Sequence, residues 1–210
     1  MPSATTIAAF ALVVLGMVLT PGPNMLYLIS RSLSQGPKAG LISLGGVACG
    51  FFVYMFAAAF GITAILFAVP LAYDALRFAG AAYLAWLAWN ALKPGARPIF
   101  ETRDLPIDGP RRLFLMGLVT NLLNPKVAVL YLSLLPQFID PSRGHVLAQS
   151  IILGLVQITV SVMGNATIAV SAGSVALFLK ERPFWARVQR WLMGTVLAGL
   201  AARMALESRR

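Results

Sequence analysis

The stretch TPGPNMLYL, residues 20–28, is followed 104 positions later by the related stretch NPKVAVLYL, residues 124–132. Seven residues are identical at this offset without a gap: Pro21, Leu26, Tyr27, Leu28, Pro37, Gly40 and Gly50. Both stretches lie in long apolar segments, where a proline interrupts a helix because it has no amide donor. The pattern predicts a helix duplicated with a break at the same depth in each copy. Such paired breaks are the best sequence indication of a transporter's substrate site.

The composition is that of a membrane protein. Hydrophobic residues make up 59% of the chain and charged residues 11%, whereas a soluble domain has about 25% charged residues. Three segments have no charged residue, namely 1–30, 39–73 and 146–179, and about 20 apolar residues are enough for one crossing. We expect an all-α integral membrane protein with transmembrane helices near 5–30, 40–69, 72–92, 113–136, 146–170 and 185–205.

The duplication also predicts the domain organisation. Residues 1–93 form a first three-helix repeat, and residues 113–210 form a second one. Because each repeat has an odd number of helices, the second copy enters the membrane inverted relative to the first. The fold class we expect is therefore six transmembrane helices as two inverted repeats. The segment 94–112, rich in prolines and charges, is predicted to be a cytoplasmic linker.

The net charge of +10 is distributed unevenly between the two sides of the predicted membrane region. Loops after spans one, three and five hold eleven basic residues, and the opposite side holds five. Basic residues favour the cytoplasmic side during insertion, so both termini are predicted to be periplasmic. The basic excess indicates an insertion signal and an affinity for the lipid bilayer. We expect no nucleic-acid partner.

The sequence contains no phosphate-binding loop, metal-ligand cluster or nucleophile motif. We therefore expect no enzyme, no catalytic residue, no cofactor and no metal site.

The first break offers the groups that a small zwitterion needs. Pro21 and Pro23 remove two amide donors and leave carbonyls of the preceding turn unpaired. Gly22 permits close approach of the backbone, and Asn24 adds a side-chain donor and acceptor. Freed backbone groups are costly in lipid, so they must face protein or a water-filled cavity. There the carbonyls can bind an ammonium and the amides a carboxylate. The alternative is a kink that serves packing only.

The second break contains Lys126, the one basic residue well inside an apolar span. An intramembrane charge is a functional hypothesis by default. The ammonium of Lys126 could pair with a substrate carboxylate, or lose its proton on desolvation and couple transport to protons. The alternative is a side chain that extends to the cytoplasmic interface. Asn124 and Pro125 form the break with Lys126, and Asn121 lies one turn earlier, where it either satisfies freed backbone or contacts substrate.

Other polar and aromatic residues have two interpretations each. Tyr27 and Tyr131, at matched positions, either line the substrate cavity or belong to an aromatic belt. Gln157 and Asn165 are best explained by hydrogen bonds between helices. Asp140 before Pro141 is best explained as a turn or helix cap. No carboxylate or histidine lies clearly within a span, so the proton-carrying residue is unassigned.

Four motifs resemble the LysE/RhtB family of amino-acid exporters, in order along the chain: Thr20–Asn24, Gly80–Leu84, Asn121–Lys126 and Leu135–Pro141. The resemblance covers almost the whole chain. It implies a secondary-active efflux transporter of the bacterial inner (plasma) membrane that exports amino acids or close derivatives, driven by protons. It does not identify the exported substrate.

Two other functions fit parts of the pattern. An uncoupled channel would use the same helices without exchange, and a scaffold protein would use the fold without transport. The paired breaks favour a carrier over both. The sequence leaves a homodimer open.

Overall fold

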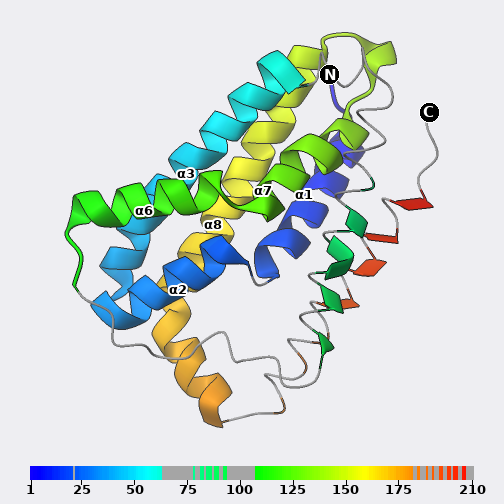
Figure 1. Ribbon diagram of the computed structural model, residues 1–210. Helices are drawn as coiled ribbons and strands as arrows, with labels where there is room; N and C mark the ends of the chain where they lie inside the picture. The colour runs from blue at the N-terminus through cyan, green and yellow to red at the C-terminus, as the bar shows by residue number, and fades with distance from the viewer. Residues whose placement is uncertain are drawn as a thin grey trace.

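The computed structural model describes residues 1–20, 22–62 and 107–181, with isolated positions between 78 and 93 and between 184 and 206. Every regular element in these ranges is helical, and the described residues contain no strand. Two long helices, α3 and α8, lie side by side along the molecule, and shorter helices pack against them (Figure 1). The described part of the chain is therefore all-α, as the apolar runs predict.

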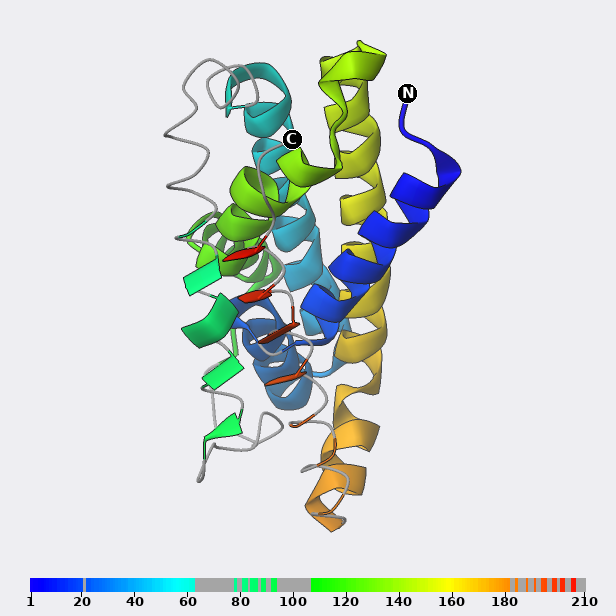
Figure 2. The ribbon, with the colours of Figure 1, turned by 90° about the vertical axis from the view of Figure 1, so that its right-hand side faces the viewer.

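A helix break is present at the first predicted position. Helix α1 (Ala4–Leu19) ends just before it and α2 (Pro23–Gln35) begins just after it, with the two axes 54° apart. Pro23 is the first residue of α2, where its missing amide leaves no hydrogen bond unmade. Pro21 lies outside the described residues. Figure 2 shows α1 lying against α8 on one side of the bundle.

The second predicted break is also present. Helix α6 (Pro110–Leu122) is followed by α7 (Pro125–Val129), and the axes on the two sides of the break differ by 49°. After α7 the chain continues through a π-helical turn (Leu130–Leu134) and a 3-10 turn (Leu135–Phe138). Asn124 caps α7 through its side-chain oxygen.

Two helices are long and apolar enough to cross a bilayer alone. These are α3 (Pro37–Ala57), prolonged by a π-helical turn (Ala58–Ile62), and α8 (Val146–Glu181). Their apolar stretches have 24 and 29 residues, each with mean hydropathy 2.0. At 1.5 Å per residue even the shorter one extends about 36 Å, more than the hydrocarbon core. With each bent pair counted as one span, the described residues hold up to four spans.

The remaining sequence predictions fall largely outside the described residues. This holds for the spans 72–92 and 185–205 and for most of the linker 94–112. One observation joins described positions of the two spans: a Cβ on Gly194 would meet the side chain of Leu92. The inverted relation of two three-helix repeats stays a prediction.

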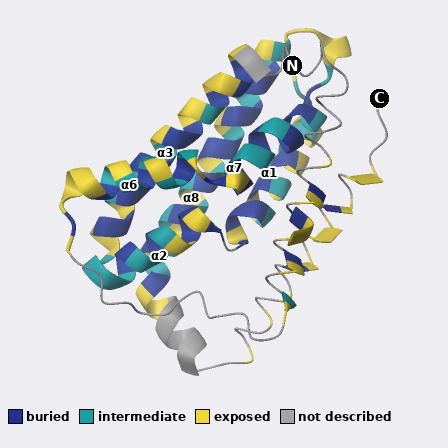
Figure 3. Cartoon of the chain, viewed as in Figure 1, coloured by how far each residue is buried: buried dark blue, intermediate teal, exposed yellow. Residues whose placement is uncertain are grey.

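The outer helix faces carry more large apolar side chains than the surface of a soluble protein, and Figure 3 shows which parts of each helix are exposed and which are buried. Large apolar side chains are exposed on the outer helix faces, among them Leu12, Phe52, Phe56, Phe60, Leu155 and Met163. Polar side chains are buried between the helices, among them Asn24, Asn121, Lys126, Gln149, Gln157 and Asn165. Lipid is the solvent that suits such a surface, because apolar side chains face it without cost and polar ones avoid it.

Helices α3 and α6 pack with their backbones in contact at glycines. A Cβ on Gly46 would collide with the carbonyl oxygen of Phe114, and a Cβ on Gly117 with that of Ser43. These glycines let the helices approach more closely than any other residue would allow, as small residues do in membrane helix pairs. The packing fixes α6, and hence the second break, against α3.

Two contacts join the broken pairs, one on each side of the breaks. Phe10 of α1 packs against Phe138 with ring centroids 5.0 Å apart. On the other side, Arg31 of α2 forms a buried ion pair with Asp108, with 2.6 Å between Nη1 and Oδ2. Asp108 also pairs with Arg112, 3.1 Å away and one helical turn later. Asp108 falls in the predicted linker, yet the structure buries it at the start of α6.

We expect Gly46→Ala to lower the melting temperature of the purified protein by several degrees, because the added methyl group forces α3 and α6 apart. Overpacking of this kind costs about 1–3 kcal/mol. Gly173→Ala on α8 is the matched control, since a Cβ there has no neighbour within 4 Å. Thermal unfolding in detergent measures both. Equal shifts for the two variants would contradict the close packing.

Candidate functional site

The two breaks meet at Lys126. Its ammonium nitrogen donates a hydrogen bond of 2.6 Å to the carbonyl oxygen of Thr20, the residue that follows α1. The lysine side chain passes against Gly22, where a Cβ would lie 3.2 Å from Cδ and 3.3 Å from Nζ of Lys126. Glycine at position 22 thus leaves the room that the lysine side chain occupies. A backbone carbonyl freed at one break and a charged side chain of the other break are directly bonded.

A cavity of about 40 Å³ lies beside this contact. Its polar lining consists of Asn24, Asn124, Lys126, Gln157, Ser161 and Asn165. Its apolar lining consists of Val14, Met17, Val18, Met25, Phe51, Val127 and Leu130, and Gly22 completes it. Helices α1, α2, α3, α7 and α8 all contribute, so the cavity lies where the two bent pairs and the two long helices converge.

The charge at this cavity is unbalanced. Lys126 is buried, with 9% of its surface exposed, and the residues that line the cavity in the described part of the chain include no carboxylate. The neutral carbonyl of Thr20 is the hydrogen-bond acceptor for the ammonium. A buried ammonium without a counter-ion is unfavourable, and an anion brought into the cavity would relieve the cost.

The start of α2 adds neutral groups of both kinds. Leu26 donates the first backbone hydrogen bond of the helix, to the carbonyl of Gly22, so the amides of Asn24 and Met25 have no partner within the helix. No side chain caps this helix end. The side-chain oxygen of Asn24 is buried and has no hydrogen-bond partner. The positive end of the α2 dipole and an unpaired acceptor therefore lie at the same cavity.

A ladder of polar side chains forms the wall on α8. Gln157, Ser161 and Asn165 recur at every fourth residue and so share one helix face. The amide group of Gln157 donates to Ser161 Oγ at 2.9 Å, and that of Asn165 donates to the Ser161 carbonyl at 2.8 Å. Tyr131, which does not line the cavity, donates a hydrogen bond to the side-chain oxygen of Gln157. The hydrogen bond from Tyr131 to Gln157 joins two elements, as the sequence predicts, whereas Asn165 bonds within α8. Ser161 is recognisable from the sequence only through its four-residue spacing from the other two.

Tyrosines satisfy backbone carbonyls around the second broken pair. Tyr54 of α3 donates a 2.9 Å hydrogen bond to the carbonyl of Leu122, the last residue of α6, which the break deprives of its helical partner. Tyr27 donates to the carbonyl of Leu113 at 2.8 Å. Tyr54 is not recognisable from the sequence, because its partner is distant in the chain.

The predicted site residues therefore separate into two groups. Four of them line the cavity: Gly22, Asn24, Asn124 and Lys126. The described residues that do not line it are Pro23, Tyr27, Asn121, Pro125 and Tyr131. Pro23 and Pro125 are the first residues of α2 and α7, and Tyr131 contacts Gln157 through a hydrogen bond. Asn121 packs against Gly50, and its side-chain nitrogen and oxygen have no hydrogen-bond partner.

A family profile and several curated relatives match most of the chain, and all of them are translocators or efflux proteins. The profile of the LysE type translocator family matches residues 15–208. The leucine efflux protein of Enterobacter sp. (strain 638) is 30% identical over 189 residues, which cover 90% of each chain. Those of Klebsiella pneumoniae subsp. pneumoniae and Salmonella typhimurium are 29% and 30% identical, each over 90% of this chain and 89% of the relative. No solved structure gives a significant match.

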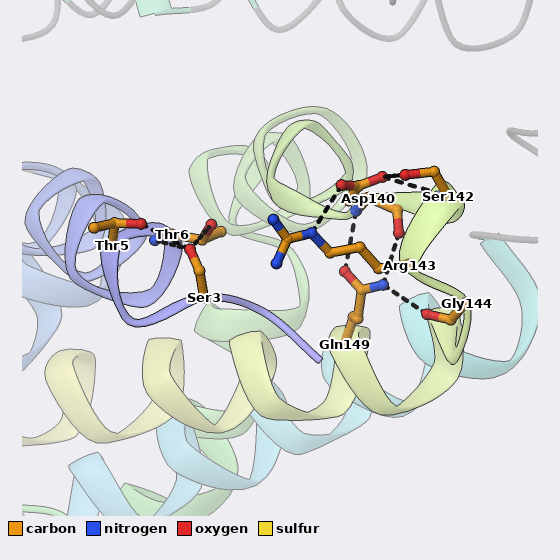
Figure 4. Close-up of polar contacts among 8 residues, drawn as sticks. All are labelled: Ser3, Thr5, Thr6, Asp140, Ser142, Arg143, Gly144 and Gln149. Atoms are coloured by element: carbon orange, nitrogen blue, oxygen red, sulfur yellow. Dashed lines mark hydrogen bonds and ion pairs between the residues drawn. The ribbon is translucent and has the colours of Figure 1, made fainter.

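Asp140 lies away from the cavity, in the loop before α8 (Figure 4). Its Oδ1 accepts hydrogen bonds from the hydroxyl and amide of Ser142, at 2.6 and 3.0 Å, and its Oδ2 lies 3.1 Å from Arg143 Nε. The side chain of Gln149 bonds both the amide and the carbonyl of Asp140. Asp140 is thus a turn cap, as the sequence predicts. The hydrogen bond from the Ser142 hydroxyl is the main cause that lowers the pKa of Asp140 below 3.8.

The lowered pKa fixes the sign of a pH effect. A carboxyl group whose pKa is lower in the folded state stabilises the fold above its unfolded pKa, and this contribution disappears as the pH falls through the folded pKa. We expect the difference in melting temperature between the wild type and Asp140→Asn to be constant from pH 5 to 8 and to shrink below pH 4. A difference that changes between pH 5 and 8 would instead make Asp140 a group that titrates near neutrality.

Proposed function

The chain belongs to the LysE type translocator family, and we propose that it exports neutral amino acids, leucine among them, across the bacterial inner membrane. The observation that carries the proposal is the buried ammonium of Lys126, which lies where two broken helices meet. The relatives are named leucine efflux proteins, which supports neutral amino acids as the substrate class. A translocator is not an enzyme, in agreement with the lack of enzyme motifs in the sequence.

The substrate carboxylate binds at Lys126. It replaces the Thr20 carbonyl as the partner of the ammonium, and it receives hydrogen bonds from the unpaired amides at the start of α2. A carboxylate neutralises the lysine charge, which the neutral carbonyl cannot do, so the exchange of partners is favourable. The helix dipole of α2 adds to the attraction because its positive end lies at the cavity.

The substrate side chain occupies the apolar part of the cavity. Val14, Met25 and Phe51 are among the residues that form this wall, and the cavity lining offers no carboxylate in the described part of the chain. A basic side chain would therefore lie near Lys126 without a counter-ion, at a substantial cost. An aliphatic side chain buries its surface there, so the chemistry of the wall favours neutral, apolar amino acids.

The small size of the cavity supports a closed state of the carrier. A cavity of about 40 Å³ has room for a few water molecules but not for an amino acid. The contacts Phe10–Phe138 and Arg31–Asp108 both hold the bent pairs together, on opposite sides of the breaks. We propose that they open alternately. The charge distribution of the sequence supports a cytoplasmic position for the Arg31–Asp108 side and a periplasmic position for both termini.

Export is driven by protons in this proposal. Lys126 is the one titratable residue in the cavity lining of the described chain, so it is the candidate for coupling. A lysine that gives up its proton would also release a bound carboxylate. A homodimer is compatible with the proposal, but the carrier site described here lies within one chain.

An uncoupled channel and a scaffold protein are the alternatives, and counterflow in proteoliposomes separates both from a carrier. Carriers accumulate labelled leucine against an internal unlabelled pool, while channels only equilibrate it and scaffolds do not move it.

We expect Lys126→Ala to reduce leucine counterflow by about 10- to 100-fold. A reduction of this size corresponds to the loss of one or two hydrogen bonds to a charged group. Lys38→Ala is the matched control, because Lys38 is an exposed lysine at the start of α3. Both variants are first checked for folding by size-exclusion chromatography in detergent. Normal counterflow by folded Lys126→Ala would refute the proposed role of the lysine.

A further inference from the structure

The side-chain oxygen of Asn24 is an acceptor for which the closed structure provides no donor. Asn24 is 7% exposed and lines the cavity, and its Oδ1 makes no hydrogen bond. An unsatisfied buried acceptor costs about 1–3 kcal/mol. Most buried polar atoms are paired, whereas this oxygen is not. Because Asn24 lines the cavity, a ligand is able to supply the missing donor.

The carbonyl of Thr20 is a second acceptor; Thr20 is not in the cavity lining, but its carbonyl is bonded to Lys126, which is. Thr20 comes directly after α1, and Asn24 is the second residue of α2, so the two oxygens come from opposite sides of one break. The Thr20 carbonyl already accepts a hydrogen bond from an ammonium, that of Lys126. When a substrate carboxylate takes Lys126, this carbonyl loses its donor. Asn24 Oδ1 in the cavity lining and the Thr20 carbonyl beside Lys126 are then both without a donor, with the negative charge of the carboxylate close to Lys126.

We propose that Asn24 Oδ1 and the Thr20 carbonyl form a subsite for the α-ammonium group of the substrate. This inference rests on the proposed export function and specifies its substrate class as primary α-amino acids. An ammonium has three donors and no acceptor, which suits two acceptor oxygens at a site with no competing carboxylate in the described lining. The zwitterion therefore inserts between Lys126 and Thr20, with its carboxylate on the lysine and its ammonium on the carbonyl that the lysine has left.

The subsite predicts rejection of leucine analogues that lack the amino group. 4-Methylpentanoate has the carboxylate and side chain of leucine but leaves both acceptors unpaired. Sites that bond a polar substrate group reject analogues without that group strongly, because buried polar atoms of the site lose their partners. Leucinol provides the opposite comparison, since it keeps the ammonium and lacks the carboxylate.

The experiment measures competition against tritiated leucine on the purified full-length protein. For the wild type we expect 4-methylpentanoate to bind at least 30-fold more weakly than leucine. Asn24→Leu removes the acceptor and keeps the number and branching of the side-chain heavy atoms. It should weaken leucine about tenfold, leave 4-methylpentanoate unchanged, and so reduce the discrimination to about threefold. Asn24→Ser, which keeps an acceptor oxygen, should give an intermediate value. If Asn24→Leu does not fold, Asn24→Ala takes its place with the same expectation.

Asn121→Leu is the matched control. Asn121 is also a buried asparagine without a hydrogen-bond partner, but it packs against Gly50 and does not line the cavity. Its substitution should leave the ratio between leucine and 4-methylpentanoate at the wild-type value. If Asn24→Leu and Asn121→Leu change this ratio equally, the subsite is overturned, because the effect of Asn24→Leu is then structural.

Two further outcomes are decisive. Equal weakening of leucine and 4-methylpentanoate by Asn24→Leu would overturn the subsite and leave the export function intact. Lack of leucine binding by the wild type would overturn the proposed function itself, and the subsite with it. Leucinol tells the two ends of the zwitterion apart: its binding should fall in Asn24→Leu but not in Lys126→Ala, whereas that of 4-methylpentanoate should show the reverse.

Discussion

The hydrogen bond from the Lys126 ammonium to the Thr20 carbonyl is the interaction on which the site depends. It joins a charge that the low-dielectric interior does not favour to a carbonyl that a helix break has deprived of its donor. Each group alone would be costly in a membrane, and each reduces the cost of the other. The bond leaves the lysine charge uncompensated, however, because the acceptor is neutral. Under the proposed function, this arrangement holds the site closed without substrate and favours a zwitterion that can satisfy both groups.

The surrounding helices keep these two groups in place. Close contact between α3 and α6 fixes the second break, through Gly46 and Gly117, and the absence of a side chain at Gly22 gives Lys126 its path to the first. A hydrogen bond from Tyr54 then satisfies the carbonyl of Leu122, which the second break would otherwise leave unpaired. Contacts on opposite sides of the breaks, between aromatic rings on one side and a buried ion pair on the other, hold the bent pairs together. These are the two contacts that would open in turn under the proposed function.

Much of this arrangement is predictable from the sequence, since prolines and glycines act locally. The offset of 104 identifies both helix breaks, and Lys126 is recognisable because a charge within an apolar span is rare. The sequence does not predict which break residues face the cavity, and Tyr27 and Asn121 face other helices. Nor does it predict the hydrogen bond from Tyr54 to α6, which joins residues 68 positions apart. Asp108 is a linker residue by sequence pattern, and only the tertiary structure brings it to Arg31.

The most direct test of the account is the distance between the two breaks, measured by solid-state NMR in lipid bilayers. Protein labelled with ¹⁵N at lysine side chains and ¹³C at threonine carbonyls should show rotational-echo dephasing between Lys126 Nζ and the Thr20 carbonyl carbon. The signal should be absent in Lys126→Met and should disappear when leucine is added at saturation. Lack of dephasing in the substrate-free wild type would mean that the breaks do not meet, and the site described here would not exist.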